Sequence, residues 1–179
     1  MQIGLAEVDI TPALGTVMSG FFETRRVRAV HDPLSARAMV LDNGSHPLMF
    51  VTCDVLALRR TTVNEAKARI QAATGLGPES IMLSAAHTHT AAAAASLFTY
   101  EPDPDYLVRL TDGILKAAQG AWGSRRPATL GIGWGFEGKL SHNRRFMMRS
   151  TKQVVMHPPK GSTDILYQEG KVDPEVGVL

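Results

Sequence analysis

Two histidines, His87 and His89, stand one residue apart at the end of an apolar run. Side chains at positions i and i+2 point to the same side of an extended chain, so both imidazoles could approach one metal ion. One could instead bind a metal while the other contacts a substrate, or both could be surface or core histidines satisfied by hydrogen bonds. Imidazole is a good zinc ligand, but a catalytic zinc needs about three ligands from the protein. The pair therefore predicts a metal site only together with other residues.

Four further polar residues could belong to such a site. Asp54 lies near the end of another apolar run, where it could orient a histidine through a hydrogen bond or cap a nearby turn. His31 stands beside an Asp-Pro pair, so it could reach a site or be an ordinary turn residue. Asn143 and Arg144 are adjacent, and an arginine can hold a polar substrate group, stabilise an oxyanion or remain solvated.

Several other kinds of site and partner are excluded by the sequence. There is no Gly-x-Ser-x-Gly elbow, phosphate-binding glycine loop, Cys-x-x-Cys or His-Glu-x-x-His motif. The one cysteine, Cys53, rules out an internal disulfide and is expected to be a small buried side chain. The formal net charge is +2, and no aromatic residues interleave the basic clusters, so nucleic acid is not an expected partner.

Length and composition predict one ordinary globular domain, residues 1–179, with 44% hydrophobic and 20% charged residues. No apolar run approaches the roughly 20 residues that a transmembrane helix needs. The amino terminus lacks the charged and then apolar pattern of a secretory signal. We therefore expect no transmembrane segment, and either a cytoplasmic protein or a mature secreted form.

The elements that must position these residues are predicted to begin with three strands. Residues 3–10 form a β-like run that ends at a Thr-Pro pair. Two more runs, residues 35–41 and 48–56, flank an Asp-Asn-Gly-Ser turn, which is a strong hairpin signal. The second of these runs is almost continuously apolar, as expected of a strand that is covered on both faces.

A helix and a further strand follow this hairpin. Thr62 and Glu65 have the spacing of a capping box, apolar residues then recur at helical spacing, and Gly75 ends the helix. Residues 80–86 predict another buried strand. The order of strand, helix and strand is typical of a parallel βαβ unit.

Ligands in open α/β sheets bind beyond the carboxyl ends of the strands. His87, His89 and Asp54 all follow predicted strand ends, so we expect them on one edge of the sheet. A second helix is predicted from Asp103, which would be its cap, and residues 128–135 predict a glycine-bearing strand. The expected fold class is α/β, with mixed sheets flanked by helices and a βαβ unit that ends at the His-x-His pair.

Six segments that follow one another along the chain resemble the amino-terminal region of the neutral/alkaline non-lysosomal ceramidases and their bacterial relatives. They are AEVDITPALGTVMSGF, VHDPLSARAMVLDNG, VTCDVLAL, SAAHTHT, HNRRF and VDPEVGVL. Members of this family are zinc-dependent amidases that cleave the N-acyl bond of ceramide. The resemblance extends over nearly the whole chain, so it implies the amino-terminal portion of such a catalytic domain, with a small-molecule or lipid amide as substrate.

The resemblance also implies roles for individual residues. His87 matches the first zinc ligand of the family's His-Thr-His motif, and His89 matches the neighbouring histidine that contacts the substrate near the scissile amide. Arg144 matches an arginine that helps to hold the substrate and the developing oxyanion. Together these matches imply hydrolysis by a metal-activated water, with zinc as the cofactor.

The chain departs from the family in two respects. Thr90 and a run of alanines replace the usual Ser-Gly-Pro, which alters the loop beside the metal. The family's remaining zinc ligands, a histidine, a glutamate and a tyrosine, are expected beyond Leu179. The chain is therefore expected to be an incomplete part of the family domain, inactive on its own and prone to self-association through exposed strand edges.

Two alternatives compete with this interpretation. A non-catalytic domain could have kept the fold and lost the metal site. The metal-dependent amidohydrolase barrel also has a His-x-His pair at a strand end, but it needs about 250 residues and carries the pair on its first strand. Neither condition holds here, so the sequence disfavours the barrel and leaves the non-catalytic domain open.

Overall fold

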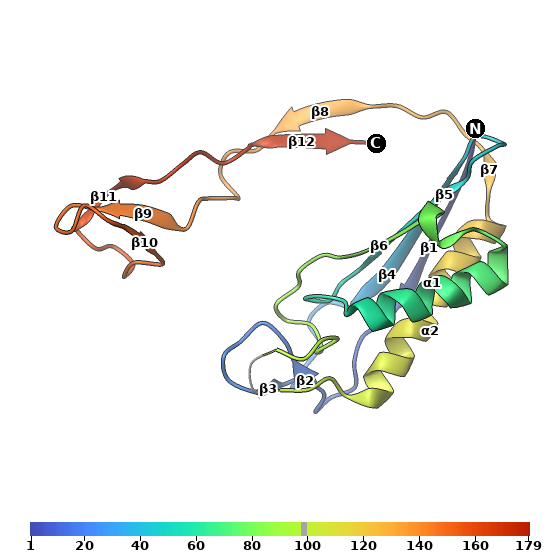
Figure 1. Ribbon diagram of the computed structural model, residues 1–179, viewed down its shortest axis with the longest axis horizontal. Helices are drawn as coiled ribbons and strands as arrows, with labels where there is room; N and C mark the ends of the chain where they lie inside the picture. Colours follow the sequence, from blue (N-terminus) through green and yellow to red (C-terminus); the bar gives the residue numbers. More distant parts are fainter. Residues whose placement is uncertain (98–99) are drawn as a thin grey trace. The chain divides into compact units, whose positions relative to one another are not determined.

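The computed structural model describes residues 1–97 and 100–179, which fall into two compact units, residues 1–129 and 130–179 (Figure 1). The elements of the first unit are β1 (Gln2–Asp9), β2 (Val17–Met18), β3 (Arg25–Arg26), β4 (Ser35–Asp42), β5 (Leu48–Cys53), α1 (Arg60–Thr74), the short 3₁₀ helix η1 (Pro78–Ser80), β6 (Ile81–Ala85), α2 (Pro104–Gly123) and β7 (Arg126–Pro127). The predicted mixed α/β class is confirmed. The assignment of the whole chain to one catalytic domain stays a prediction.

The first unit is built on a five-stranded sheet with the strand order β6-β5-β4-β1-β7. Strand β4 pairs antiparallel with both β1 and β5, whereas β5 and β6 run parallel, with Cys53 opposite Ala85. Helix α1 connects the two parallel strands, so the predicted βαβ unit is confirmed. Helices α1 and α2 lie on the same face of the sheet (Figure 1).

The turn between β4 and β5 has the hairpin chemistry that the sequence predicts. Gly44 has a φ of +91°, in the left-handed region that glycine adopts without steric penalty. The Asn43 Oδ1 atom accepts hydrogen bonds from the backbone N–H groups of Ser45 and His46, at 3.1 and 2.8 Å. These local bonds close the turn and help to set the register of the two strands.

The ends of the helices agree only partly with the prediction. Helix α1 begins at Arg60, before the predicted capping box, and its N-cap is Arg59. The side chain of Arg59 makes no capping hydrogen bond. The capping role predicted for Thr62 is therefore wrong, and this residue is buried inside the helix instead. Gly75 ends α1 with a φ of +75°, and Asp103 caps α2 through its side chain, both as predicted.

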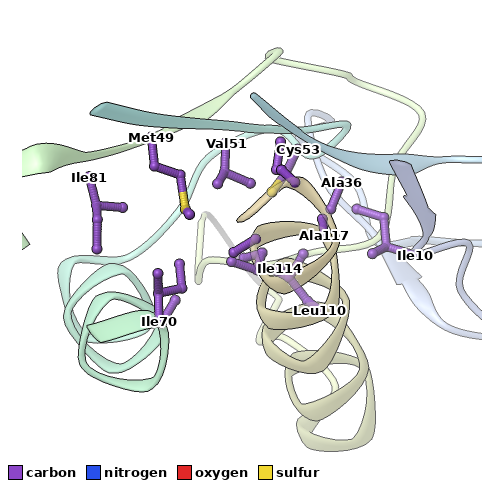
Figure 2. Packing of buried hydrophobic residues seen from close by; sticks show 14 of the residues in the cluster. Ile10, Ala36, Met49, Val51, Cys53, Ile70, Ile81, Leu110, Ile114 and Ala117 are labelled. Carbon is purple, nitrogen blue, oxygen red and sulfur yellow. The ribbon is translucent and has the colours of Figure 1, made fainter. Parts of the chain in front are cut away.

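The core lies between the sheet and the two helices (Figure 2). Met49, Val51 and Cys53 are every second residue of β5, and all three are buried. They join one cluster with Ile70 of α1 and Ile114 of α2. Because successive side chains of a strand point to opposite faces, the other residues of β5, which are Leu48, Phe50 and Thr52, point away from the helices.

No helix covers that second face of the sheet within the first unit as described. Leu48 of β5 and Met82 of β6 expose 44% and 56% of their surface. The prediction that residues 48–56 form a strand covered on both faces is therefore wrong, and the strand predicted as buried at residues 80–86 is buried only in part. The apolar runs were misleading because Leu48, Phe50 and Met82, which alternate with core positions, are also apolar although they do not join the core cluster.

The second unit consists of short strands. They are β8 (Gly133–Phe136), β9 (Arg145–Met148), β10 (Val154–Met156), β11 (Ile165–Gln168) and β12 (Glu175–Val178). Strand β8 pairs antiparallel with β12, and β9 lies between β10 and β11. The strand predicted at residues 128–135 is found only from Gly133 onward. The strands that follow show no clear sequence signal, because three or four residues are too few to establish an alternation.

The helices of the structure were compared with the length and apolar content that a transmembrane helix needs. Of the helices formed by residues 1–97 and 100–179, none has an apolar stretch long enough to cross a membrane.

Ile114→Ala tests the packing of α2 against the sheet. Ile114 is fully buried, so its truncation should lower the free energy of unfolding by about 2 to 5 kcal/mol, measured by urea denaturation. Val108→Ala is the matched control on the same helix, because Val108 is 60% exposed and its truncation should change stability by less than about 0.5 kcal/mol. Equal losses in the two variants would contradict this packing of the helix.

Cys53 is buried in this core, as the sequence predicts. Burial and, to a smaller extent, the charge of Asp54 raise the pKa of its thiol from 9.0 to about 12. Above roughly pH 9, the unfolded chain therefore loses a proton that the native chain keeps until about pH 12. The unfolded state binds fewer protons in this window, so the free energy of unfolding falls as the pH rises.

Cys53→Ala should weaken this pH dependence. Between about pH 8 and about pH 10, the wild-type chain should lose about 1 kcal/mol more unfolding free energy than the variant, measured by urea denaturation at both values. Any constant effect of the substitution on stability cancels, because the comparison is between the two losses. Identical losses would mean that the thiol titrates alike in the native and unfolded states.

Candidate functional site

The two histidines lie in the loop that follows β6, and this loop is hydrogen-bonded to the last residue of β5 and to the segment that follows β5. The backbone N–H of Ala86 donates to the carbonyl of Cys53 at 2.9 Å, and the N–H of Thr88 donates to that of Val55 at 3.2 Å. His87, between these two bonds, has a φ of +62°. A residue other than glycine held in this left-handed region costs on the order of 1–3 kcal/mol, and such residues cluster at functional sites.

Both imidazoles use the same ring nitrogen to contact a backbone carbonyl. The Nδ1 atom of His87 lies 3.0 Å from the oxygen of Leu56, and the Nδ1 atom of His89 lies 3.0 Å from the oxygen of Gly20. Because a carbonyl only accepts, each hydrogen bond requires a proton on Nδ1. A neutral ring of this tautomer carries its lone pair on Nε2, as a metal-ligating histidine does.

The two rings are close to each other and accessible. Their centroids are 4.9 Å apart, and the planes meet edge to face at 79°. Both His87 and His89 are at least partly exposed. The structure thus brings the predicted pair together in a defined arrangement that a ligand can reach.

The chemistry of this pair fits zinc, although the number of ligands falls short. Zinc is bound by neutral imidazoles, and a catalytic site takes about three ligands from the protein. Within residues 1–97 and 100–179, no group of three or more His, Cys, Asp and Glu side chains could hold one ion. The described part of the chain therefore offers at most His87 and His89 to such a metal.

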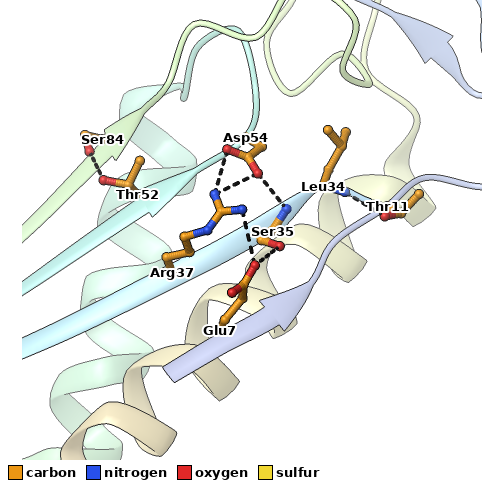
Figure 3. A network of polar contacts seen from close by, with 8 residues as sticks. All are labelled: Glu7, Thr11, Leu34, Ser35, Arg37, Thr52, Asp54 and Ser84. Atoms are coloured by element: carbon orange, nitrogen blue, oxygen red, sulfur yellow. Dashed lines mark hydrogen bonds and ion pairs between the residues drawn. The ribbon is translucent and has the colours of Figure 1, made fainter. Parts of the chain in front are cut away.

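Asp54 belongs to a polar network on the sheet face away from the helices (Figure 3). Its carboxylate accepts from the backbone N–H of Ser35 at 2.9 Å and from the Arg37 guanidinium at 2.9 and 3.0 Å. Arg37 also pairs with Glu7 at 3.2 Å, and the Ser35 hydroxyl donates to Glu7 at 2.6 Å. Among the described residues, the carboxylate of Asp54 contacts Ser35 and Arg37 rather than either histidine. A role for Asp54 in orienting a histidine or a substrate stays a prediction.

A cavity of about 580 Å³ lies beside the histidine loop. Its walls are mostly apolar, with side chains such as Met18, Val27 and Leu34, and its polar lining includes His31 and Asp54. The threonines on either side of His89 also line the cavity, whereas the two histidines do not. The cavity is thus a neighbour of the imidazole pair and not the space between the rings.

His31 is a surface residue at this cavity. Its Nδ1 atom lies 2.8 Å from the carboxylate of Asp32, and both side chains are almost fully exposed. This pair matches the simpler of the two interpretations of His31, that of a turn residue. A contact of His31 with a substrate stays a prediction.

Asn143 and Arg144 lie in the second unit, whereas the histidines lie in the first. The side chain of Arg144 is exposed, and its backbone carbonyl accepts from the N–H of His157 at 3.0 Å. Asn143 accepts from the N–H of Arg145 at 3.0 Å and donates to the carbonyl of Glu169. Asn143 thereby connects the start of β9 with the segment after β11. The substrate-binding roles of Arg144 and Asn143 stay predictions.

Sequence reasoning missed Gly20, which contacts the histidine loop, and Tyr100, which contacts Gly20. Gly20 accepts from His89, and its N–H donates to the hydroxyl of Tyr100 at 2.9 Å. His89 is 69 positions from Gly20, and Tyr100 is 80 positions from Gly20, so a local sequence pattern does not predict these contacts. A partial signal is the Ser19-Gly20 dipeptide, which places a small, flexible residue within one of the segments that resemble the ceramidase family.

The run of alanines after the histidines is buried rather than exposed. Ala91, Ala92 and Ala93 have no exposed surface, and Ala94 has 1%. The carbonyl of Ala91 accepts from the N–H of Ser19 at 3.0 Å, so the run pairs with the segment that leads to Gly20. The small side chains allow this close packing beneath the loop.

Two solved structures have a similar fold. A ceramidase complexed with C2 matches with a TM-score of 0.72 and 26% sequence identity, over 80% of this chain and 24% of that chain. The neutral ceramidase from Pseudomonas aeruginosa matches with a TM-score of 0.69 and 25% identity, over 83% of this chain and 25% of that chain. No protein-family model and no curated protein matches. The resemblance to the neutral ceramidases is thereby confirmed, and the chain spans about a quarter of the ceramidase structures it matches.

Proposed function

We propose that this chain, whose fold is that of part of a neutral ceramidase, supplies part of the metal and substrate site of a hydrolase that cleaves an N-acyl amide bond. The observation that carries the proposal is the arrangement of His87 and His89. Each ring holds Nδ1 against a backbone carbonyl and keeps Nε2 for a ligand. The similarity to two ceramidase structures supports the hydrolase class.

In this proposal the residues of the chain divide the work at the site. His87 is a zinc ligand, oriented by the carbonyl of Leu56. When bound, zinc would polarise a carbonyl group and lower the pKa of water. His89 contacts the substrate near the scissile amide, and Arg144 stabilises negative charge on the carbonyl oxygen, as the family resemblance implies.

The substrate we propose is a small-molecule or lipid amide. Sites for such molecules are mostly apolar and have volumes of about 300–1,000 Å³. The cavity of about 580 Å³ beside the histidine loop has this character and would accept an apolar group of the substrate. Its threonine hydroxyls and the nearby imidazoles would then meet the polar end of the same molecule.

The site as proposed needs further ligands. His87 is the one zinc ligand that this chain supplies in the proposal, whereas a catalytic zinc takes about three ligands from the protein. The chain spans about a quarter of the ceramidase structures it matches, so other polypeptide would supply the missing ligands. We therefore expect the 179-residue chain to bind zinc weakly and not to hydrolyse amides by itself. Self-association through the edge strands β6 and β7 is part of the same proposal.

A non-catalytic domain that kept the fold and lost the metal site is the second candidate. The observation that favours it is the absence of a three-ligand cluster within the described residues. The two candidates differ in whether His87 binds zinc at all.

Zinc titration of the 179-residue chain distinguishes these functions. Followed by calorimetry and by the NMR signals of the histidine rings, zinc should bind at one site and perturb His87 and His89 before the other histidines. Loss of a residue that only hydrogen-bonds to a metal ligand weakens metal binding about 10- to 100-fold. His87→Ala removes a ligand itself, so it should weaken zinc binding by more than this. His46→Ala is the matched control, since His46 is an exposed histidine of the β4–β5 turn and should leave the affinity unchanged.

The result that would overturn the metal site is equally definite. If wild type and His87→Ala bind zinc alike, His87 is not a ligand and the non-catalytic domain is favoured. An assay with a fluorogenic N-acyl amide should show no turnover by the chain alone. Zinc-dependent turnover that His87→Ala abolishes would mean that the site is complete, in contradiction to the ligand count above.

A further inference from the structure

Gly20 approaches the imidazole of His89 more closely than any other residue type could. The φ of Gly20 is +91°, in the left-handed region. A Cβ atom at this position would lie 2.5 Å from Nδ1 of His89 and 2.8 Å from its Cγ. Carbon atoms do not approach ring atoms to such distances, so any side chain at Gly20 would displace the ring. The missing side chain is therefore a condition for the observed place of His89.

The backbone of Gly20 is held from both sides. Its carbonyl accepts from Nδ1 of His89 at 3.0 Å, and its N–H donates to the Tyr100 hydroxyl at 2.9 Å. Tyr100 is buried, with only 4% of its surface exposed. A hydrogen bond to each polar atom fixes the rotation of the glycine backbone and thereby the direction of the carbonyl.

The segment before Gly20 is anchored to the chain that follows His89. The N–H of Ser19 donates to the carbonyl of Ala91 at 3.0 Å, and the N–H of Ala93 donates to the carbonyl of Val17 at 2.8 Å. This short antiparallel ladder continues through the bridge between Met18 and Ala92. Because the ladder joins the segments that carry Gly20 and His89, their relative position is set by backbone bonding and not by the exposed ring itself.

We propose that Gly20 is a positioning residue for His89. Its carbonyl selects the tautomer with the proton on Nδ1, and its missing side chain leaves the ring in the one place where that hydrogen bond forms. Nε2 of His89 then remains an acceptor. The use of that acceptor on a substrate rests on the function proposed above, whereas the selection of the tautomer does not.

Two other glycines separate this role from that of an ordinary turn glycine. Gly15 has a φ of +89° and Gly44 one of +91°, so both share the backbone conformation of Gly20. A Cβ at Gly15 or Gly44 would meet no atom within 4 Å. An alanine at any of the three positions strains the backbone alike, but only Gly20→Ala also meets the ring of His89.

The test is the tautomer of His89 in the 179-residue chain, free of metal. Histidine side chains are labelled with ¹⁵N, and long-range ¹H–¹⁵N correlations are recorded at about pH 8.5, where ordinary imidazoles are neutral. Wild type should show His89 with a protonated Nδ1 and an unprotonated Nε2. Gly20→Ala should lose this single-tautomer pattern at His89, whereas Gly15→Ala and Gly44→Ala should keep it.

Each outcome decides for or against the positioning role. An unchanged His89 pattern in folded Gly20→Ala overturns it, and so does an equal change in Gly15→Ala or Gly44→Ala. If Gly20→Ala does not fold, Tyr100→Phe removes the acceptor of the Gly20 N–H and should lower the Nδ1-protonated population of His89. No change in that variant also overturns the proposal.

The readout distinguishes this proposal from the hydrolase function. The tautomer is measured without zinc or substrate, so a chain that fails to bind zinc can still show the loss in Gly20→Ala. In that case the positioning role stands and the metal site fails. Zinc binding at His87 together with an unchanged His89 in Gly20→Ala would mean the reverse, with the metal site standing and the positioning role overturned.

Discussion

The parallel pairing of β5 with β6 is the interaction on which the candidate site depends. It brings the carboxyl ends of two strands together, and backbone hydrogen bonds from Ala86 to Cys53 and from Thr88 to Val55 extend it beyond the sheet. Parallel neighbours require a long connection, which is α1, and the core between sheet and helices holds that connection in place. Exposed imidazoles therefore occupy fixed positions, because the backbone that carries them is part of the hydrogen-bonded frame.

Local signals predicted the parts of the fold that short-range chemistry determines. The turn at Asn43, the end of α1 at Gly75 and the cap of α2 at Asp103 each depend on a few neighbouring residues, and each is confirmed. The errors arose where distant parts of the chain decide the outcome. Coverage of β5, for example, depends on where two helices pack. The wrong start of α1 is a local error, because Arg59 rather than Thr62 is its N-cap. The histidine pair was visible in the sequence, but its partner Gly20 lies 69 positions away and was not.

Carboxylate and imidazole have separate tasks at this end of the sheet. Asp54 forms an ion pair with Arg37 and accepts a hydrogen bond from the N–H of Ser35, and these contacts connect the end of β5 with β4. Each imidazole makes one hydrogen bond through Nδ1. A carboxylate already engaged by a guanidinium and a backbone N–H has little capacity left for a cation. The carboxylate of Asp54 is therefore committed to the contact between β4 and the end of β5.

The left-handed backbone of His87 has a consequence for how this position can change. A glycine there would adopt a φ of +62° without steric penalty, and asparagine would tolerate it better than most residues. Glycine at position 87 would thus relieve the backbone strain, but it would also remove the hydrogen bond between the imidazole and the carbonyl of Leu56. The two effects change the stability of the native chain in opposite directions. The net effect of a substitution at position 87 therefore depends on how much of the backbone strain this one hydrogen bond offsets.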